Sequence, residues 1–333
     1  MIRWAQDFLE PIFLGIKNMA IPVTIITGFL GAGKTTFLNA LLAHLSTQKL
    51  AIIENEFGKE NIDSELIIGS KEEIMTLTQG CICCTLNEDF YLLLHNLHKR
   101  EAELDGLVIE TTGIADPSGI LTPFLVTPAL REAFPIARVI CLVDASLINQ
   151  QLQETEEAIT QISYSNHLLL VKTDVVSPAV VKELQQMLAE INPTAHIWTG
   201  QKGAYPLKEI LEKGNVFTLP EPFFENKPSE KKHGKITSFT FQFTTPFDAS
   251  VLHYRLAAFL VFQAKGVYRM KGILAVQDKE KQVILQTVGT QLVWEDGRDW
   301  QKEEPRNSRI VLIGRDLKRE GYEKLFKQCL AKI

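Results

Sequence analysis

A glycine-rich stretch near the start of the chain carries a lysine and a hydroxyl side chain at the spacing of a phosphate-binding loop. Residues 28–35 read GFLGAGKT, which matches G-x-x-x-x-G-K-[ST] at every fixed position, after a strand-like run and before a helical one. The glycines let backbone N–H groups wrap a phosphate, Lys34 would reach the β- and γ-phosphates, and Thr35 would bind Mg²⁺. The predicted phosphate-binding residues are Gly28, Gly31, Ala32, Gly33, Lys34, Thr35 and Thr36.

A carboxylate follows the apolar run 107–109, and a glycine stands three residues further on. A phosphate-binding loop needs a second acidic group near Mg²⁺ and a glycine whose N–H can approach the γ-phosphate. Glu110 and Gly113 are the candidates. Because glutamate replaces the commoner aspartate, its extra methylene favours contact with Mg²⁺ through a water molecule, or contact with the attacking water. We expect Lys34, Thr35 and Glu110 to be the catalytic residues.

A base-reading motif is expected after the apolar run 169–171. Guanine-binding proteins usually carry Asn-Lys-x-Asp there, whereas this chain has Val171, Lys172, Thr173 and Asp174. Asp174 would accept hydrogen bonds from guanine N1–H and N2–H₂, and the Lys172 stem would pack on the base. The valine removes a supporting hydrogen bond, so the sequence still favours GTP over ATP but less strongly.

Three cysteines fall within four positions, Cys81, Cys83 and Cys84. Zn²⁺ binds thiolates in tetrahedral geometry, so a three-cysteine loop needs one more ligand, for which a carboxylate, a histidine or water would serve. Glu54 and Glu56 are candidates because they follow a neighbouring strand. Three protein thiolates predict an exchangeable metal site. Buried structural cysteines and a redox pair are the alternatives.

Composition and charge restrict the class of protein. The chain has 333 residues, 45% of them hydrophobic, with a net charge of −5, which is typical of a globular protein of about two domains. The mild acidity argues against nucleic acid as a partner. Clustered cysteines argue against a disulfide framework, and Cys141 and Cys329 are expected in the core. We expect a cytoplasmic protein that does not enter a membrane, because the apolar stretch 8–16 is short and interrupted.

The order of apolar segments predicts an α/β fold. Short strand-like runs at 23–27, 51–53, 106–109, 137–143, 167–171 and 195–198 alternate with helical patterns. This alternation is typical of a mainly parallel sheet covered on both faces, here in a P-loop NTPase domain. A smaller α+β domain is expected after it, with strands near 236–243, 272–277, 282–287 and 308–313 and helices at 248–262 and 317–330.

Changes in pattern predict the domain boundaries. Residues 1–20 are expected to form an N-terminal extension, 21–218 the nucleotide-binding domain, and 236–333 the C-terminal domain. The range 219–235 is rich in proline and charge and is expected to be a linker. Lys265, Arg269 and Lys271 are expected on a solvated strand face.

Taken together, these motifs resemble the CobW-type family of metal-handling GTPases, and within it the zinc-chaperone-like members. The resemblance rests on residues 28–36, ENEFG at 54–58, GCICC at 80–84 and ETTGIADP at 110–117, in that order. The stretches 268–274 and 309–315, with Trp300, are similar to the family's C-terminal domain. The resemblance covers residues 21–330.

The resemblance implies a GTPase of low intrinsic activity that binds Zn²⁺ and delivers it to a client apo-metalloprotein, with GTP and Mg²⁺ as the other ligands. It also implies that Glu54 joins the cysteines at the metal. Residues 54–63 are expected to include a nucleotide-sensitive switch. A zinc-responsive regulator without a client, a cobalt or nickel chaperone and a thiol-redox switch stay open as alternatives, as does a homo-oligomer.

Overall fold

The computed structural model describes residues 20–54, 73–76, 88–213, 229–233 and 235–332. The chain divides into two compact units, one comprising residues 1–185 and 196–216 and the other residues 186–195 and 217–333. The predicted metal ligands Cys81, Cys83 and Cys84 lie outside the described residues. No helix in the described ranges is long and apolar enough to cross a bilayer.

The first unit contains a seven-stranded sheet in the order β3-β2-β4-β1-β5-β6-β7, with every pair parallel. Its carboxyl ends therefore meet at one edge, where ligands of open α/β sheets bind. The predicted fold class is confirmed, and the short strand β3 is an addition to it. The strands are β1 (Val23–Gly28), β2 (Leu50–Glu54), β3 (Glu73–Thr76), β4 (Gly106–Glu110), β5 (Ile136–Asp144), β6 (His167–Val171) and β7 (His196–Thr199).

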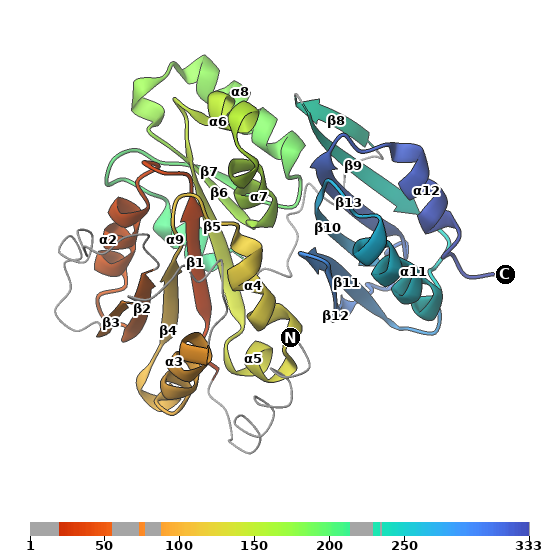
Figure 1. Ribbon diagram of the computed structural model, residues 1–333, viewed down its shortest axis with the longest axis horizontal. Helices are drawn as coiled ribbons and strands as arrows, with labels where there is room; N and C mark the ends of the chain where they lie inside the picture. The colour runs from red at the N-terminus through yellow and green to blue at the C-terminus, as the bar shows by residue number, and fades with distance from the viewer. Residues whose placement is uncertain (1–19, 55–72, 77–87, 214–228, 234, 333) are drawn as a thin grey trace. The chain divides into compact units, whose positions relative to one another are not determined.

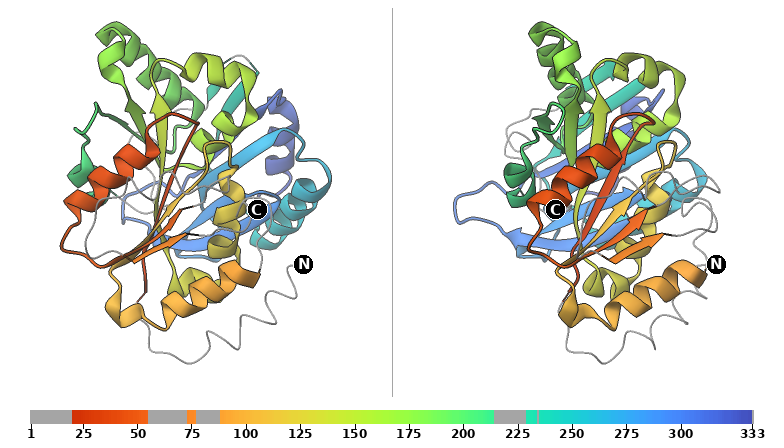
Figure 2. Two further views of the ribbon diagram at one scale, coloured as in Figure 1. Left: turned by 60° about the vertical axis from the view of Figure 1, so that its left-hand side comes forward. Right: turned by 90° about the vertical axis from the view of Figure 1, so that its left-hand side faces the viewer.

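Helices cover both faces of this sheet (Figures 1 and 2). Helix α2 buries the apolar stripe Phe37, Leu38, Leu41 and Leu42 against strand side chains such as Ile26, and α9 joins the same cluster. The rings of Phe90 and Phe124, from α3 and α4, pack edge to face. The helices are α2 (Lys34–His44), α3 (Glu88–His98), α4 (Pro117–Val126), α5 (Pro128–Ala133), α6 (Ile148–Glu154), α7 (Glu156–Tyr164), α8 (Pro178–Ile191) and α9 (Leu207–Glu212), with short 3₁₀ turns η2 (Glu101–Glu103) and η3 (Thr173–Val175).

The second unit is a six-stranded antiparallel sheet in the order β12-β11-β10-β13-β9-β8. Helices α11 (Ala249–Phe262) and α12 (Arg319–Lys327) pack on one face of it (Figure 1). Between these helices and the sheet lies a core that contains four phenylalanines from or near β9, together with Phe326 of α12. The strands are β8 (Ser229–His233), β9 (Ile236–Phe243), β10 (Val267–Leu274), β11 (Lys281–Val288), β12 (Gln291–Asp299) and β13 (Ser308–Arg315).

Two expectations for this unit are wrong. Residues 229–233, expected within the linker, form strand β8, because their backbone pairs with β9 along 236–240. Arg269 and Lys271, expected on a solvated face, are 2% and 1% exposed. Burial lowers the pKa of Lys271 well below its ordinary value, and the charge of Arg269 lowers it further. Cys141 and Cys329 are buried as expected.

Candidate functional site

The glycine-rich loop joins β1 to α2 and depends on backbone conformations that favour glycine. Gly28, Gly31 and Gly33 have φ angles of 140°, 75° and 87°, in the range that side chains with a Cβ rarely adopt. A Cβ at Gly28 would also lie 2.5 Å from the carbonyl oxygen of Leu142. Helix α2 then begins at Lys34, so its first N–H groups face the loop. The result is an anion-binding cradle at a helix N-terminus.

The catalytic candidates converge at the carboxyl ends of β1 and β4. The Thr35 hydroxyl donates to Glu110 Oε1 at 3.2 Å, and Lys34 is buried with 9% exposure. Mg²⁺ prefers oxygen ligands and is usually held by one or two protein groups beside phosphates. Thr35 and Glu110 therefore fit this ion, which would offset phosphate charge when bound.

The loop after β4 touches the glycine-rich loop. A Cβ on Gly113 would lie 2.7 Å from both N and Cα of Leu30, so only glycine allows this approach. Gln161, on α7, donates to the carbonyl oxygens of Gly113 and Ala115, each at 3.1 Å. The loop that carries Gly113 is thus held in place by a helix that is distant in the sequence. Gln161 was not predicted, because a polar residue within a helical pattern gives no sign of this role.

Lys172 does more than the sequence indicated. Its Nζ donates to the Gly31 carbonyl oxygen at 2.9 Å and to Asp144 Oδ2 at 2.6 Å, and so joins the segment expected to read the base to the glycine-rich loop. Burial by itself would raise the pKa of the Asp144 carboxyl, but hydrogen bonds from Lys172 and Ser146 hold that pKa below its ordinary value. Asp144 ends an apolar strand just as Glu110 does, and this was the one signal in the sequence for its role.

Asp174 lies in η3 and is exposed, so its carboxylate is accessible to a nucleotide base. The neighbouring Thr173 hydroxyl donates to the Gly200 carbonyl oxygen at 3.3 Å. The Gly200 N–H donates to the Leu170 carbonyl oxygen at 2.9 Å. The loop after β7 therefore lies beside the base-reading segment, a contact that the sequence gave no reason to expect.

Backbone register places the metal candidate Glu54 next to the nucleotide site. Glu54 is the last residue of β2, and it pairs with Glu110 on one side and with Thr76 on the other. Within the described ranges no three His, Cys, Asp or Glu residues converge on a possible metal position. Glu56 and the three clustered cysteines lie outside those ranges, so the composition of the zinc site stays a prediction.

Comparison with known proteins gives matches over most of the chain. Residues 22–199 match the model of the CobW/HypB/UreG nucleotide-binding domain, and residues 236–330 match the cobalamin synthesis protein CobW C-terminal domain. The chain is 36% identical to the zinc chaperone YjiA of Escherichia coli, covering 92% of this chain and 98% of that one. It is 28% identical to the zinc chaperone CobW of Pseudomonas aeruginosa, covering 96% and 94%.

Solved structures agree with these matches. The Zn(II)-bound YjiA GTPase from E. coli superposes with a TM-score of 0.73 at 30% identity, covering 94% of this chain and all of that one. A Zn(II)-bound triple mutant of the same protein, in which one glutamate and two consecutive cysteines are replaced by alanine, superposes equally well.

The parallel sheet, the glycine-rich loop and the Thr35–Glu110 pair define a P-loop nucleotide-binding protein. With both family models matched in order, the chain belongs to the CobW/HypB/UreG family and is a GTPase.

Proposed function

We propose that this chain is a zinc metallochaperone that couples metal transfer to a client apo-metalloprotein with GTP hydrolysis. One observation carries the proposal: Thr76, Glu54 and Glu110 form a continuous row across β3, β2 and β4. Neighbouring strands lie about 5 Å apart. The candidate metal ligand Glu54 is therefore one strand from the carboxylate that touches Thr35, and the cysteine segment follows the end of β3.

The described residues have distinct roles in this proposal. Loop N–H groups and Lys34 bind the β- and γ-phosphates, Thr35 and Glu110 hold Mg²⁺, and Glu110 orients the attacking water. Asp174 accepts from the guanine N–H groups, and Lys172 keeps the phosphate loop and the base-reading segment together. Cys81, Cys83, Cys84 and Glu54 bind Zn²⁺, for which thiolates are suited. The two relatives above are both named zinc chaperones, which supports zinc as the metal.

Coupling between the two sites follows from their shared row of strand ends. A γ-phosphate that shifts the backbone at Glu110 would also shift Glu54, which is hydrogen-bonded beside it in the sheet. Because such coupling is reciprocal, zinc should also change the affinity for nucleotide.

The test is zinc affinity, measured by competition with a chelating dye under reducing conditions, with and without a non-hydrolysable GTP analogue. We expect tight zinc binding whose affinity changes by about 5-fold or more when the analogue binds. Zinc-bound crystals of the triple mutant show that zinc binding in that relative does not require those three side chains. A Cys83→Ala/Cys84→Ala variant is therefore titrated in parallel. Unchanged zinc affinity on adding nucleotide would contradict the coupling.

Transfer is tested separately. Zinc-loaded chain is mixed with an apo-metalloprotein, and metal appearance in the acceptor is followed with GTP, with the analogue, and with free zinc at the same total concentration. Faster loading from the chain with GTP than with the analogue supports a chaperone. No difference between the chain and free zinc would favour a regulator without a client.

A further inference from the structure

Helix α11 of the C-terminal unit has apolar side chains on two sides. Its inner stripe, with a spacing of four, is buried against the sheet. A second stripe, with spacings of three, seven and one, lies on the outer side and is exposed. The inner stripe is Leu252, Leu256 and Leu260, and the outer one is Val251, Tyr254, Val261 and Phe262, with exposures of 36%, 76%, 64% and 81%. Apolar side chains gathered in this way mark interaction surfaces.

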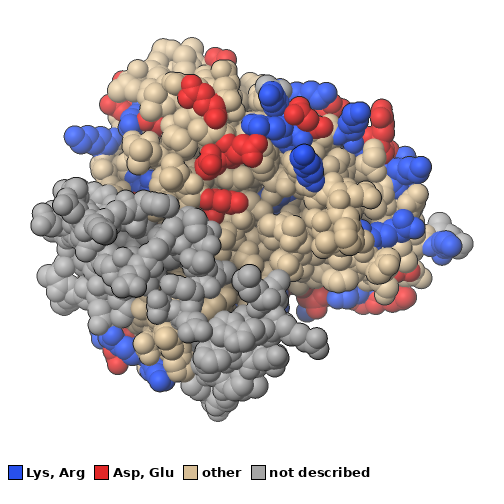
Figure 3. Space-filling model, in the orientation of Figure 1, with Lys and Arg blue, Asp and Glu red and all other residues tan. Residues whose placement is uncertain are grey.

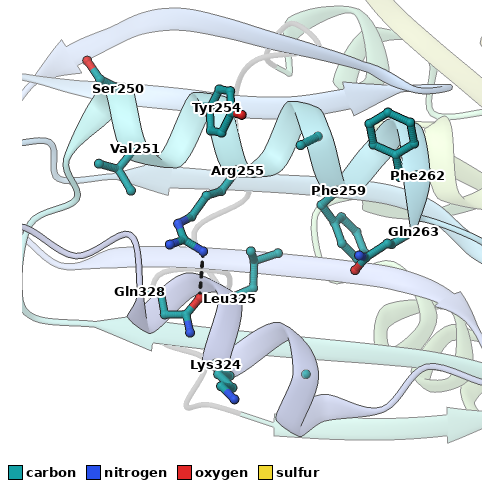
Figure 4. Close-up of a pocket in the computed structure, with 12 residues that line it drawn as sticks. Ser250, Val251, Tyr254, Arg255, Phe259, Phe262, Gln263, Lys324, Leu325 and Gln328 are labelled. Atoms are coloured by element: carbon teal, nitrogen blue, oxygen red, sulfur yellow. Dashed lines mark hydrogen bonds between the residues drawn. The ribbon is translucent and has the colours of Figure 1, made fainter.

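A groove runs between α11 and α12 beside this outer stripe, with a volume of about 870 Å³. Figure 4 shows Arg255 reaching from α11 toward Gln328, the residue that directly follows α12. The Arg255 guanidinium donates to Gln328 Oε1 at 2.9 Å. Over α11 the face seen in Figure 3 consists mainly of uncharged residues. The groove thus combines apolar side chains, such as Tyr254, Phe259 and Phe262, with polar ones, and one hydrogen bond joins α11 to the residue after α12.

The charges in the groove are all positive. Arg255 and Lys324 are the charged residues in its lining, and no carboxylate is among the lining residues. Glu323 of α12 is paired elsewhere, with Lys327 at 2.7 Å. Within the part of the chain that the structure describes, neither Arg255 nor Lys324 has a carboxylate partner. A ligand with acidic groups would therefore complement the groove.

We propose that this groove binds an amphipathic helix of a partner protein, one that carries aspartate or glutamate beside its apolar stripe. Helix-in-groove recognition lays the apolar face of a helix into a hydrophobic groove, and Tyr254, Phe259 and Phe262 supply apolar walls for it here. A two-fold contact between two copies would bring the Arg255 and Lys324 cations of both copies into one interface, where no carboxylate of the groove lining offsets them. A lipid surface would leave a concave groove unfilled. Both alternatives therefore fit less well than an acidic helix.

The test uses two synthetic fluorescent peptides of about 15 residues, with the same leucine and phenylalanine stripe. One carries glutamate beside the stripe and the other carries lysine. Each is titrated with the full chain by fluorescence anisotropy. We expect the glutamate peptide to bind at least about tenfold more tightly. Equal affinities, or no binding by either peptide, would overturn the proposal.

Variants locate the binding to the groove. Phe262→Asp removes the most exposed apolar side chain, and Lys324→Glu reverses a charge that has no partner in the described residues. We expect Phe262→Asp to abolish binding of the glutamate peptide, and Lys324→Glu to shift the preference toward the lysine peptide. The control is Leu92→Asp, which changes a 49% exposed leucine on α3 and should leave the affinity unchanged.

Two further measurements can overturn the proposal. Self-association in light scattering that Phe262→Asp abolishes would show that a second copy occupies the groove. Co-sedimentation with phosphatidylserine vesicles that Phe262→Asp abolishes would show that it binds lipid. A monodisperse chain that does not co-sediment, together with the peptide preference, supports the acidic helix.

Discussion

At the scale of single residues, Lys172 and Asp144 hold the nucleotide site together. Asp144 is 1% exposed and accepts from the Lys172 amine, the Ser146 N–H and the Ser146 hydroxyl. A carboxylate with three donors stays ionised even when buried, because each hydrogen bond favours the charged form. The pair therefore holds Gly31 of the phosphate loop through Lys172.

Asp144→Asn is expected to lower the free energy of unfolding by about 1–3 kcal/mol at neutral pH. The folded-state pKa of Asp144 lies below its ordinary value of 3.8. Its contribution is therefore present above that pH and is lost as the pH falls through the folded pKa. Urea unfolding at a series of pH values measures the difference between wild type and variant, which should shrink below about pH 4. The control is Glu183→Gln, an exposed carboxyl on α8. A difference that is independent of pH would contradict this reading of Asp144.

Asp174→Asn is expected to weaken the preference for GTP over inosine triphosphate. In the proposed base site the wild-type carboxylate would accept from both N1–H and N2–H₂ of guanine, and inosine lacks the second group. Hydrogen bonds to charged groups contribute about 1.5–3 kcal/mol, so discrimination should fall by roughly 10-fold or more. Competition binding with the two nucleotides measures the ratio. An unchanged ratio would mean that the base is read elsewhere.

At the scale of elements, the site depends on how closely the loop after β4 approaches the loop after β1. Gly113→Ala places a methyl group 2.7 Å from backbone atoms of Leu30, so one loop must move. We expect a loss of about 1–3 kcal/mol in the free energy of unfolding and weaker GTP binding.

A matched glycine gives the control for that substitution. Gly321 lies in α12, and a Cβ there would meet no atom within 4 Å. Gly321→Ala should stabilise the chain by up to about 1 kcal/mol, since alanine favours a helix. Chemical unfolding and nucleotide titration measure both variants. If Gly113→Ala has the same effect as Gly321→Ala, the close contact of the two loops does not govern the site.

At the scale of the whole molecule, we expect metal and nucleotide to communicate. Cys83→Ala/Cys84→Ala should remove two zinc ligands, and the variant should still fold and bind GTP, because the P-loop is held by Lys172, Asp144 and Gly113. It should lose the zinc dependence of GTP turnover. Turnover and GTP affinity are measured with and without zinc in both proteins. If zinc binds tightly to the wild type but changes neither its GTP turnover nor its GTP affinity, the coupled mechanism is wrong.

The sequence by itself determined the class of the fold and the phosphate loop. G-x-x-x-x-G-K-[ST] between an apolar strand and a helix has few other uses, and alternating short strands and helices require a parallel sheet covered on both faces. These properties are local, because they depend on glycine conformation and on the period of apolar residues. The cysteine spacing predicted a metal site and the family resemblance favoured Glu54 as a further ligand, but Cys81, Cys83 and Cys84 lie outside the described residues.

Only the tertiary structure decided which distant groups meet. Asp144, Gln161 and the loop at Gly200 support the site from separate elements, and nothing in their own segments indicates a partner 27 to 48 residues away. Strand β8 is another example, because its charged segment forms a strand only by pairing with β9. The burial of Arg269 and Lys271 is a further one. A charged or polar side chain has no fixed place in a periodic pattern. Its position is set by the neighbours that tertiary packing brings to it, and the local sequence does not specify those neighbours.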